Sequence, residues 1–226
     1  MPNERELILP ERWSAAAALI ALPVCRILLP DVLTGIGLDL FAVNYLYLAM
    51  NFLLVCPLFY SFLLRSLPAF REGRQRVKSA LVAGIVGHYV GAFILSLALI
   101  FTGVRPQTVN NEIVRMLTWN APVLMLFLTV VAAPVTEECF FRGALFGLLY
   151  KRSRVAAYLV TAVAFAAFHA IPGVASGNWM ELYSALPYVA PGVALCYVYE
   201  KTGTVWTSIL LHAIINAVAF ILTIVN

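Results

Sequence analysis

Two adjacent glutamates and an arginine interrupt an otherwise apolar part of the chain. They are Glu137, Glu138 and Arg142, within the segment PVTEECFFRG at 134–143. Ionised side chains in apolar surroundings are costly, so they are candidates for a functional site. On an α-helix Glu138 and Arg142 lie four residues apart on one face and can pair. Glu137 is rotated by about 100° from its neighbour and has no cation one turn away. Because burial favours the neutral form of a carboxyl group, the unpaired Glu137 suits a general acid or base.

Three histidines add polar groups to other apolar stretches. His169 lies in FAAFHAIP, His88 in IVGHYVG, and His212 in LLHAIINA, with Asn216 one turn later on the same face. Measured from the expected cytoplasmic helix ends, Glu137 and His169 lie about 20 Å up, Asn216 about 18 Å and His212 about 12 Å. These depths are compatible with one site near the middle of the membrane. A lone membrane histidine more often bonds two helices together, and we expect that of His88.

The composition predicts that membrane helices position these groups. The chain of 226 residues is 62% hydrophobic and 12% charged, with a mean hydropathy of +0.91. A soluble domain is nearer to half apolar and a quarter charged. Because a spanning helix needs about 20 apolar residues and lipid cannot satisfy backbone polar groups, we expect an all-α bundle with seven spans. The expected spans are roughly 13–29, 39–64, 79–103, 118–150, 155–171, 183–199 and 204–225.

The segments between and within these spans carry further expectations. Segment 118–150 would be about 50 Å long as one helix, so we expect a kink at Pro134, next to the glutamates. VNNEIVRML at 109–117 is expected to lie on the membrane surface as a short amphipathic helix. Segments 65–78 and 172–182 are expected to be loops.

Basic residues are distributed unequally between the two sides. With the N-terminus in the cytoplasm, only Arg105 and Arg115 fall in outer loops. The positive-inside rule then predicts an N-in, C-out topology. The basic charge is explained by topology, so we expect a lipid bilayer and no nucleic acid as partner. The inner side would carry Arg5, Arg12, Arg65, Arg71, Arg74, Arg76, Lys78, Lys151, Arg152, Arg154 and Lys201.

Four scattered cysteines (25, 56, 139 and 196) lack CxxC spacing. This argues against a disulfide framework and against a zinc knuckle. Cys139 lies about 200° around the helix from Glu137, so we expect it to pack in the interior, as we expect of Cys196. A thiol nucleophile is the alternative for either residue.

Three ordered motifs resemble a known family. EECFFRG at 137–143 matches EExxxR, FAAFH at 165–169 matches FxxxH, and HAIIN at 212–216 matches HxxxN. In this order they resemble the CPBP family, which comprises type II CAAX prenyl proteases and bacteriocin-processing (Abi-type) enzymes. The resemblance covers about 118–226, and the spans within 1–117 match no family that we can name. We expect a single membrane domain over 1–226, with 118–226 as its catalytic core. Members of the family commonly have eight spans, whereas this chain has seven candidates.

The resemblance implies an intramembrane endopeptidase that cuts near the C-terminus or membrane anchor of a membrane-associated protein or peptide. At the matching positions, Glu137 and His169 would activate a water molecule. His212 and Asn216 would hold the oxyanion of the tetrahedral intermediate. Two polar groups on one helix face suit that task independently of the resemblance. The remaining motif residues, Glu138 and Arg142, would brace the helix.

Other functions remain open at this stage. Two histidines and a carboxylate could hold a zinc ion, but the usual HExxH helix is absent, so we favour a mechanism without metal or cofactor. A cysteine-dependent sorting protease, a non-enzymatic immunity or assembly protein and a small proton-coupled transporter are the alternatives. The substrate could be a prenylated C-terminus, a leader peptide or a C-terminal sorting anchor. The compact chain fits a multi-pass protein of a prokaryotic cytoplasmic membrane.

Overall fold

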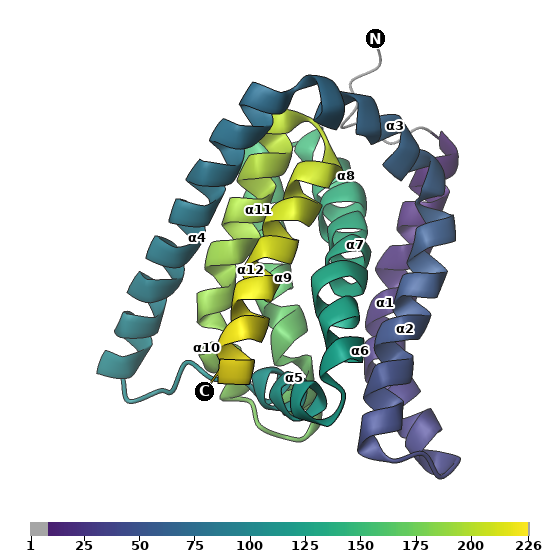
Figure 1. Ribbon diagram of the computed structural model, residues 1–226, viewed down its shortest axis with the longest axis vertical. Coiled ribbons are helices and arrows are strands. Elements are labelled where there is room, and N and C mark those ends of the chain that lie inside the picture. Colours follow the sequence, from purple (N-terminus) through teal and green to yellow (C-terminus); the bar gives the residue numbers. More distant parts are fainter. Residues whose placement is uncertain (1–8, 226) are drawn as a thin grey trace.

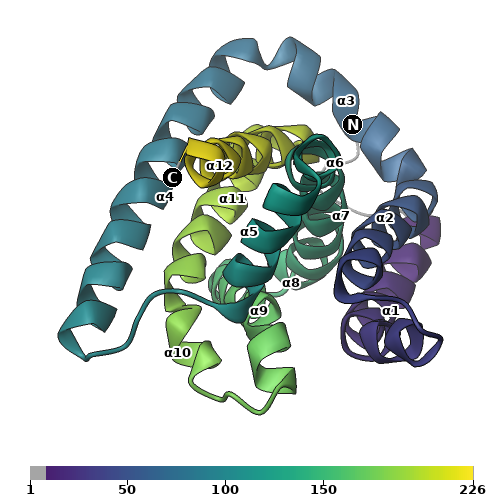
Figure 2. The same ribbon diagram turned by 60° about the horizontal axis from the view of Figure 1, so that its bottom comes forward.

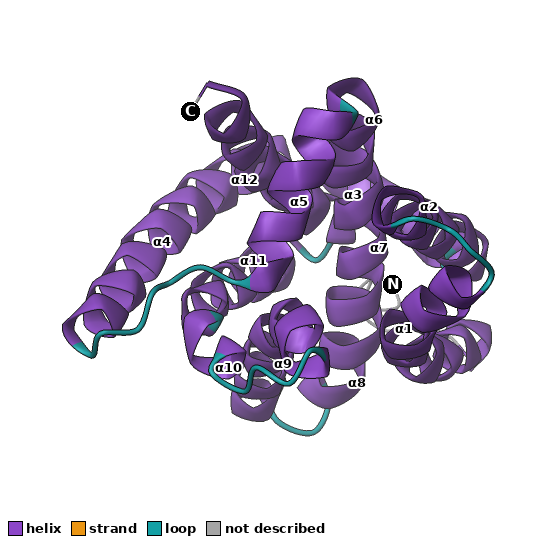
Figure 3. Cartoon of the chain, turned by 90° about the horizontal axis from the view of Figure 1, so that it is seen from below, coloured by secondary structure: helices purple, strands orange, loops and turns teal. Residues whose placement is uncertain are grey.

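The computed structural model describes residues 9–225, and helices form most of this part. No strand occurs in the described part, as the view in Figure 3 shows. Arg5, which contributed to the expected topology, and residue 226, the end of the expected domain, lie outside the described residues. The elements in chain order are α1 (Leu9–Gly35), α2 (Leu40–Leu58), α3 (Tyr60–Glu72), α4 (Arg74–Phe101), α5 (Val109–Asn120), α6 (Pro122–Phe127), η1 (Leu128–Ala132), α7 (Ala133–Glu138), η2 (Cys139–Phe146), α8 (Gly147–Tyr150), α9 (Arg154–Ala175), α10 (Glu181–Ser184), η3 (Leu186–Tyr188), α11 (Val189–Thr202) and α12 (Val205–Val225).

Within the described residues, seven helical stretches are long and apolar enough to cross a membrane, which confirms the expected polytopic bundle. The largest differences from the expected bounds are in the first three stretches: the first ends at Gly35 rather than 29, the second ends at Leu58 rather than 64, and the third begins at Arg74 rather than 79. The stretches are Glu11–Gly35, Leu40–Leu58, Arg74–Phe101, Pro122–Tyr150, Arg154–Ala175, Glu181–Thr202 and Val205–Val225.

The helices run up and down between two ends of the molecule. In Figure 1, α3 crosses the upper end and α5 lies at the lower end, while α7, α9, α11 and α12 occupy the centre. Helix α4 flanks this centre on one side and packs on α11, and the α1–α2 pair flanks the other side. The central helices are therefore the ones that can enclose a site.

The second expected span, 39–64, is too long, and the expected loop 65–78 is wrong. Helix α2 ends at Leu58, because the backbone of Phe59 leaves the helical region before α3 begins. Helix α3 has an apolar stripe that includes Phe62 and Leu63, both buried, and this stripe packs on the end of the bundle. The Leu63 carbonyl accepts a hydrogen bond from Trp206 Nε1 at 2.9 Å. The segment is helical because this amphipathic pattern is satisfied at the end of the bundle.

The fourth span, Pro122–Tyr150, contains two π-helical segments. One of them, η1, comes just before Pro134, and the other, η2, follows Glu138 directly. The expected irregularity near the proline thus takes the form of widened π turns on both sides of the glutamates. Such turns occur frequently at functional sites, since they re-aim side chains within a continuous helix.

Helix α5 confirms the expected short amphipathic helix and extends it to Asn120. It packs against α6, α9 and α12 and crosses the lower end of the bundle (Figure 2). Its N-terminal turn is anchored by Glu181, whose Oε2 accepts a hydrogen bond from the Val109 amide at 3.0 Å. Glu181 is buried, and it belongs to α10 rather than to the loop that we expected over 172–182.

Two glycines let helices of the bundle approach closely. At Gly192 of α11, an added Cβ would lie 2.8 Å from Ala162 Cα of α9. At Gly84 of α4, an added Cβ would lie 2.7 Å from side-chain atoms of Val198 and Leu211. Small residues at such positions let membrane helices approach closely.

Candidate active site

The motif residues converge on one cavity inside the bundle. Glu137 comes from α7, His169 from α9, and His212 and Asn216 from α12. All four line a cavity of about 700 Å³. The four side chains are therefore brought together around one cavity, as expected of a single site.

Glu137 faces both histidines. Its Oε2 lies 4.0 Å from His169 Nε2 and 3.9 Å from His212 Nε2. Oε2 is buried and has no hydrogen-bond partner in the described part of the chain. A buried acceptor left without a partner is costly, and such atoms are uncommon in folded proteins. Glu137 is thus the carboxylate that no side chain satisfies, as the helix geometry predicts.

His169 is oriented by the backbone and by an aromatic ring. Its Nδ1 is 2.8 Å from the Phe165 carbonyl, which can only accept, so Nδ1 carries the proton. Its ring stacks on Tyr188, with centroids 4.1 Å apart and an interplanar angle of 21°. In the neutral ring, the Nε2 lone pair is consequently free and is directed toward Glu137.

Glu138 binds two partners behind the cavity wall. Its Oε1 accepts a hydrogen bond from Arg142 Nη1 at 2.9 Å and one from His212 Nδ1 at 2.8 Å. The Glu138 and Arg142 side chains are both 0% exposed, and Arg142 Nη2 also donates to the Gly192 carbonyl at 3.0 Å. The ion pair with Arg142 agrees with the prediction from helix geometry. The bond to His212 was not predicted, because it joins residues 74 positions apart.

Asn216 lies on the cavity wall but its amide is engaged. Nδ2 donates to the Thr129 carbonyl of η1 at 2.8 Å. The expected oxyanion donor therefore has one of its two N–H groups committed to the backbone. Its second N–H group is the one that remains for a ligand.

His88 also lines the cavity, from α4. Its buried Nδ1 has no hydrogen-bond partner among the described residues. The helix–helix hydrogen bond that we expected of His88 is thus not made at this atom.

Arg26 and Tyr188 are among the cavity residues that the sequence analysis missed. Arg26 of α1 lies on the same wall, and Tyr188 of η3 stacks on His169 and donates to Asn111 Oδ1. A usable signal existed for Arg26, because it is an ionisable residue within an apolar span, like Glu137. No local signal marks Tyr188, since its role depends on which helix lies beside it.

The cysteines are all free, and Cys139 and Cys196 are buried. Neither is among the residues that line the cavity. Among residues 9–225, no group of three histidine, cysteine or carboxylate side chains is arranged to hold a metal ion.

Part of the C-terminal half is similar to a known protein family. Residues 119–218 match the family described as "Type II CAAX prenyl endopeptidase Rce1-like". The chain is 24% identical over 178 residues to "Putative membrane peptidase YdiL" of Bacillus subtilis (strain 168), which covers 75% of this chain and 68% of that protein. It is also 24% identical over 143 residues to "UPF0177 protein YvdC" of Lactococcus lactis subsp. lactis (strain IL1403), covering 60% of this chain and 52% of that protein. No solved structure gives a significant match. The resemblance indicated by the three motifs is therefore confirmed, because residues 119–218 are similar to the type II CAAX prenyl endopeptidase Rce1-like family.

Proposed function

We propose that this protein hydrolyses a peptide bond near the C-terminus or membrane anchor of a membrane-associated substrate. The family and the name of the Bacillus relative support a membrane-embedded protease in general. The single observation that carries the catalytic assignment is the unsatisfied Oε2 of Glu137, which faces two histidine nitrogens across the cavity.

The distances around Glu137 suit a water molecule. At 4.0 Å and 3.9 Å, the separations from Oε2 to the two Nε2 atoms are too long for direct hydrogen bonds. They are short enough for one water to bond to Glu137 and to a histidine together. In our proposal Glu137 accepts the water's proton, the His169 Nε2 lone pair orients the water, and the oxygen attacks the substrate carbonyl.

His212 and Asn216 are proposed to stabilise the oxyanion. Because Nδ1 of His212 donates to Glu138, its Nε2 becomes a donor only when the ring is protonated. Since the Glu138 carboxylate fixes the Nδ1 side of the ring, we assign Glu138 a second role as the residue that orients His212. The free N–H of Asn216 is the second donor, and one such donor contributes about 10²–10³-fold to the rate.

A comparison of protein termini tests this function directly. Membranes from cells that produce the wild-type protein or Glu137→Gln would be compared by quantitative mass spectrometry of C-terminal and N-terminal peptides. We expect at least one membrane-associated protein to carry a new terminus only with the wild type. Identical sets of termini in both samples would contradict the proposal.

The proposed mechanism uses no metal. We expect the purified protein, assayed on a substrate identified in that comparison, to keep its activity in strong chelators. Metal analysis should find far less than one zinc per chain. Activity that is lost on chelation and restored by zinc would instead support a site made from Glu137, His169 and His212.

The substrate class and the location follow from the same arguments. A cavity enclosed by spanning helices suits a substrate that is itself held at the membrane, such as a prenylated C-terminus, a leader peptide or a sorting anchor. Relatives in two bacteria support a prokaryotic cytoplasmic membrane as the location.

A further inference from the structure

Arg26 is a cation on the wall of the cavity that contains Glu137. It lies inside the first span, nine residues before the end of α1 at Gly35. At the helical rise, this places it about 14 Å from that end of the helix. Nothing in the family match accounts for it, since the match begins at residue 119.

The contacts of Arg26 leave its charge without a carboxylate. Nη2 donates to Asn110 Oδ1 at 2.8 Å, and the guanidinium lies over the rings of Tyr47 (4.8 Å) and Phe168 (5.6 Å). Nε is buried and has no hydrogen-bond partner in the described part of the chain. Among residues 9–225, no carboxylate lies within 4.0 Å of this guanidinium.

Other arginines of the bundle are neutralised. Arg142 pairs with Glu138 at 2.9 Å, and Arg65 pairs with Glu11 at 2.5 Å. An arginine inside a membrane protein normally has such a partner, because an unpaired charge there is expensive. Arg26 therefore has the chemistry of a site for an anion that arrives from outside the chain.

We propose that Arg26 binds the C-terminal carboxylate of the substrate while its peptide bond lies at Glu137. This inference rests on the proposed function, because it assumes that a peptide occupies the cavity. A guanidinium offers planar N–H groups that match a carboxylate, and Nε is the donor that is still unused. A peptide has a backbone carboxylate only at its C-terminus. Arg26 would thus select a bond a short distance from a free C-terminus.

Two other sources of an anion are an acidic substrate side chain and a lipid headgroup. A headgroup stays at the membrane surface, whereas Arg26 lies about 14 Å inside the span. An acidic side chain has the same carboxylate chemistry as a chain terminus, so the experiment must separate these two.

A binding measurement tests the inference without a natural substrate. Purified protein in detergent would be titrated with acetyl-trileucine as the free acid, acetyl-trileucine amide, and acetyl-Leu-Glu-Leu amide, with thermal stability as the readout. We expect the free acid to raise the melting temperature and the two amides to have little effect. In Arg26→Gln the free acid should bind about 10- to 100-fold more weakly, as expected for a lost charge-assisted hydrogen bond. Arg26→Lys should recover part of the effect.

The controls separate this inference from the proposed function. Arg105→Gln removes an exposed arginine that does not line the cavity, so it should keep the preference for the acid. Glu137→Gln should also keep this preference while losing hydrolysis. If Glu137→Gln still hydrolyses substrate, the catalytic proposal fails, but the binding test is unaffected.

Three outcomes would overturn the role of Arg26. The wild type could be stabilised equally by acid and amide, or by neither, and this result holds even if Arg26→Gln does not fold. Arg26→Gln could retain the preference for the acid. Acetyl-Leu-Glu-Leu amide could match the free acid, which would reject the chain terminus as the ligand.

Discussion

At the scale of single residues, the two adjacent glutamates differ in their partners. Oε1 of the fully buried Glu138 accepts hydrogen bonds from Arg142 and His212, although its Oε2 accepts none. The Glu137 side chain is 17% exposed, and its Oε2 faces two histidine nitrogens without a hydrogen bond. Helical geometry alone separates them, because only Glu138 shares a face with Arg142. The difference predicts distinct consequences for the same substitution at neighbouring positions.

Glu137→Gln should give a folded protein with a turnover reduced by about 10²- to 10⁴-fold, since the amide keeps the shape but cannot accept a proton. Cleavage of a substrate identified by terminal proteomics, together with the melting temperature, measures both effects. Glu72→Gln, at an exposed position of α3, is the matched control and should change neither. Near-normal turnover in Glu137→Gln would remove this residue from the mechanism.

Glu138→Gln and Arg142→Gln should each destabilise the protein by about 3–5 kcal/mol, since each leaves a buried charge without its partner. The double mutant should be milder than the sum of the two, because both singles break the same pair. The free energies of unfolding of the wild type, the two single mutants and the double mutant give the coupling energy between the two residues. Strict additivity would show that the ion pair does not act as a unit.

Glu138→Gln should also reduce turnover more than Arg142→Gln does, after correction for the folded fraction. Of these two residues only Glu138 bonds to His212, so its loss leaves the orientation of that ring undetermined. Single-turnover cleavage on the folded fraction provides the comparison. Equal turnover in the two variants would contradict the assigned link between Glu138 and His212.

At the scale of elements, the sequence predicts features that depend on neighbouring residues and misses contacts between distant helices. The spans follow from apolar length, and the Glu138–Arg142 pair follows from a spacing of four residues. The bond from Asn216 to Thr129 could not be predicted, because it depends on the contact between α12 and η1. Helix α3 was mistaken for part of a span and a loop, since Arg65 and Arg71 interrupt its apolar sequence.

Helix α5 shows how a short element depends on a distant anchor. The Glu181 carboxylate accepts a hydrogen bond from the Val109 amide at the first turn of α5. Glu181→Gln should weaken this charge-assisted bond by about 1 kcal/mol and speed hydrogen exchange over 109–120. Exchange measured by mass spectrometry resolves that segment.

Glu112→Gln, on the same helix, is the control for this prediction. It breaks only the partly exposed 2.7 Å pair with Arg115, and such pairs contribute little to stability. The rate of hydrogen exchange over 109–120 in this variant should stay close to that of the wild type. If both variants exchanged alike, Glu181 would not be the anchor of α5.

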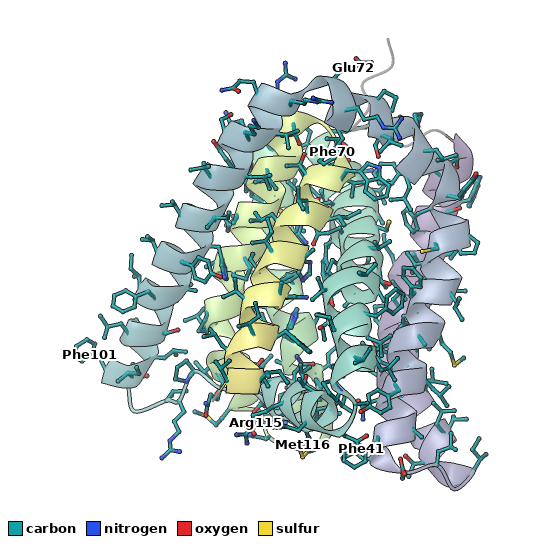
Figure 4. The ribbon with its side chains drawn as sticks, viewed as in Figure 1. Phe41, Phe70, Glu72, Phe101, Arg115 and Met116 are labelled. Atoms are coloured by element: carbon teal, nitrogen blue, oxygen red, sulfur yellow. The ribbon has the colours of Figure 1, made fainter. Side chains whose placement is uncertain are left out.

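At the scale of the whole molecule, the distribution of basic residues predicts how the bundle is oriented in the membrane. Figure 4 labels Glu72 on α3 at one end and Arg115 on α5 at the other. The two basic segments that we expect in the cytoplasm, 65–78 and 151–154, lie at the end where α3 crosses, and 104–117 lies at the opposite end (Figure 1). Because both basic segments lie at one end, the positive-inside rule predicts that this end faces the cytoplasm.

Cysteine labelling tests this orientation with two exposed arginines, Arg71 near the end of α3 and Arg105 in the segment before α5. A membrane-impermeant maleimide added to intact cells should modify Arg105→Cys, whereas Arg71→Cys should react only after permeabilisation. The unsubstituted protein supplies the background from its four free cysteines. The reverse pattern would invert the topology, and α5, which packs across the lower end of the bundle, would then face the cytoplasm. A substrate approaching the cavity from the end covered by α5 would in that case come from the cytoplasm rather than from outside the cell.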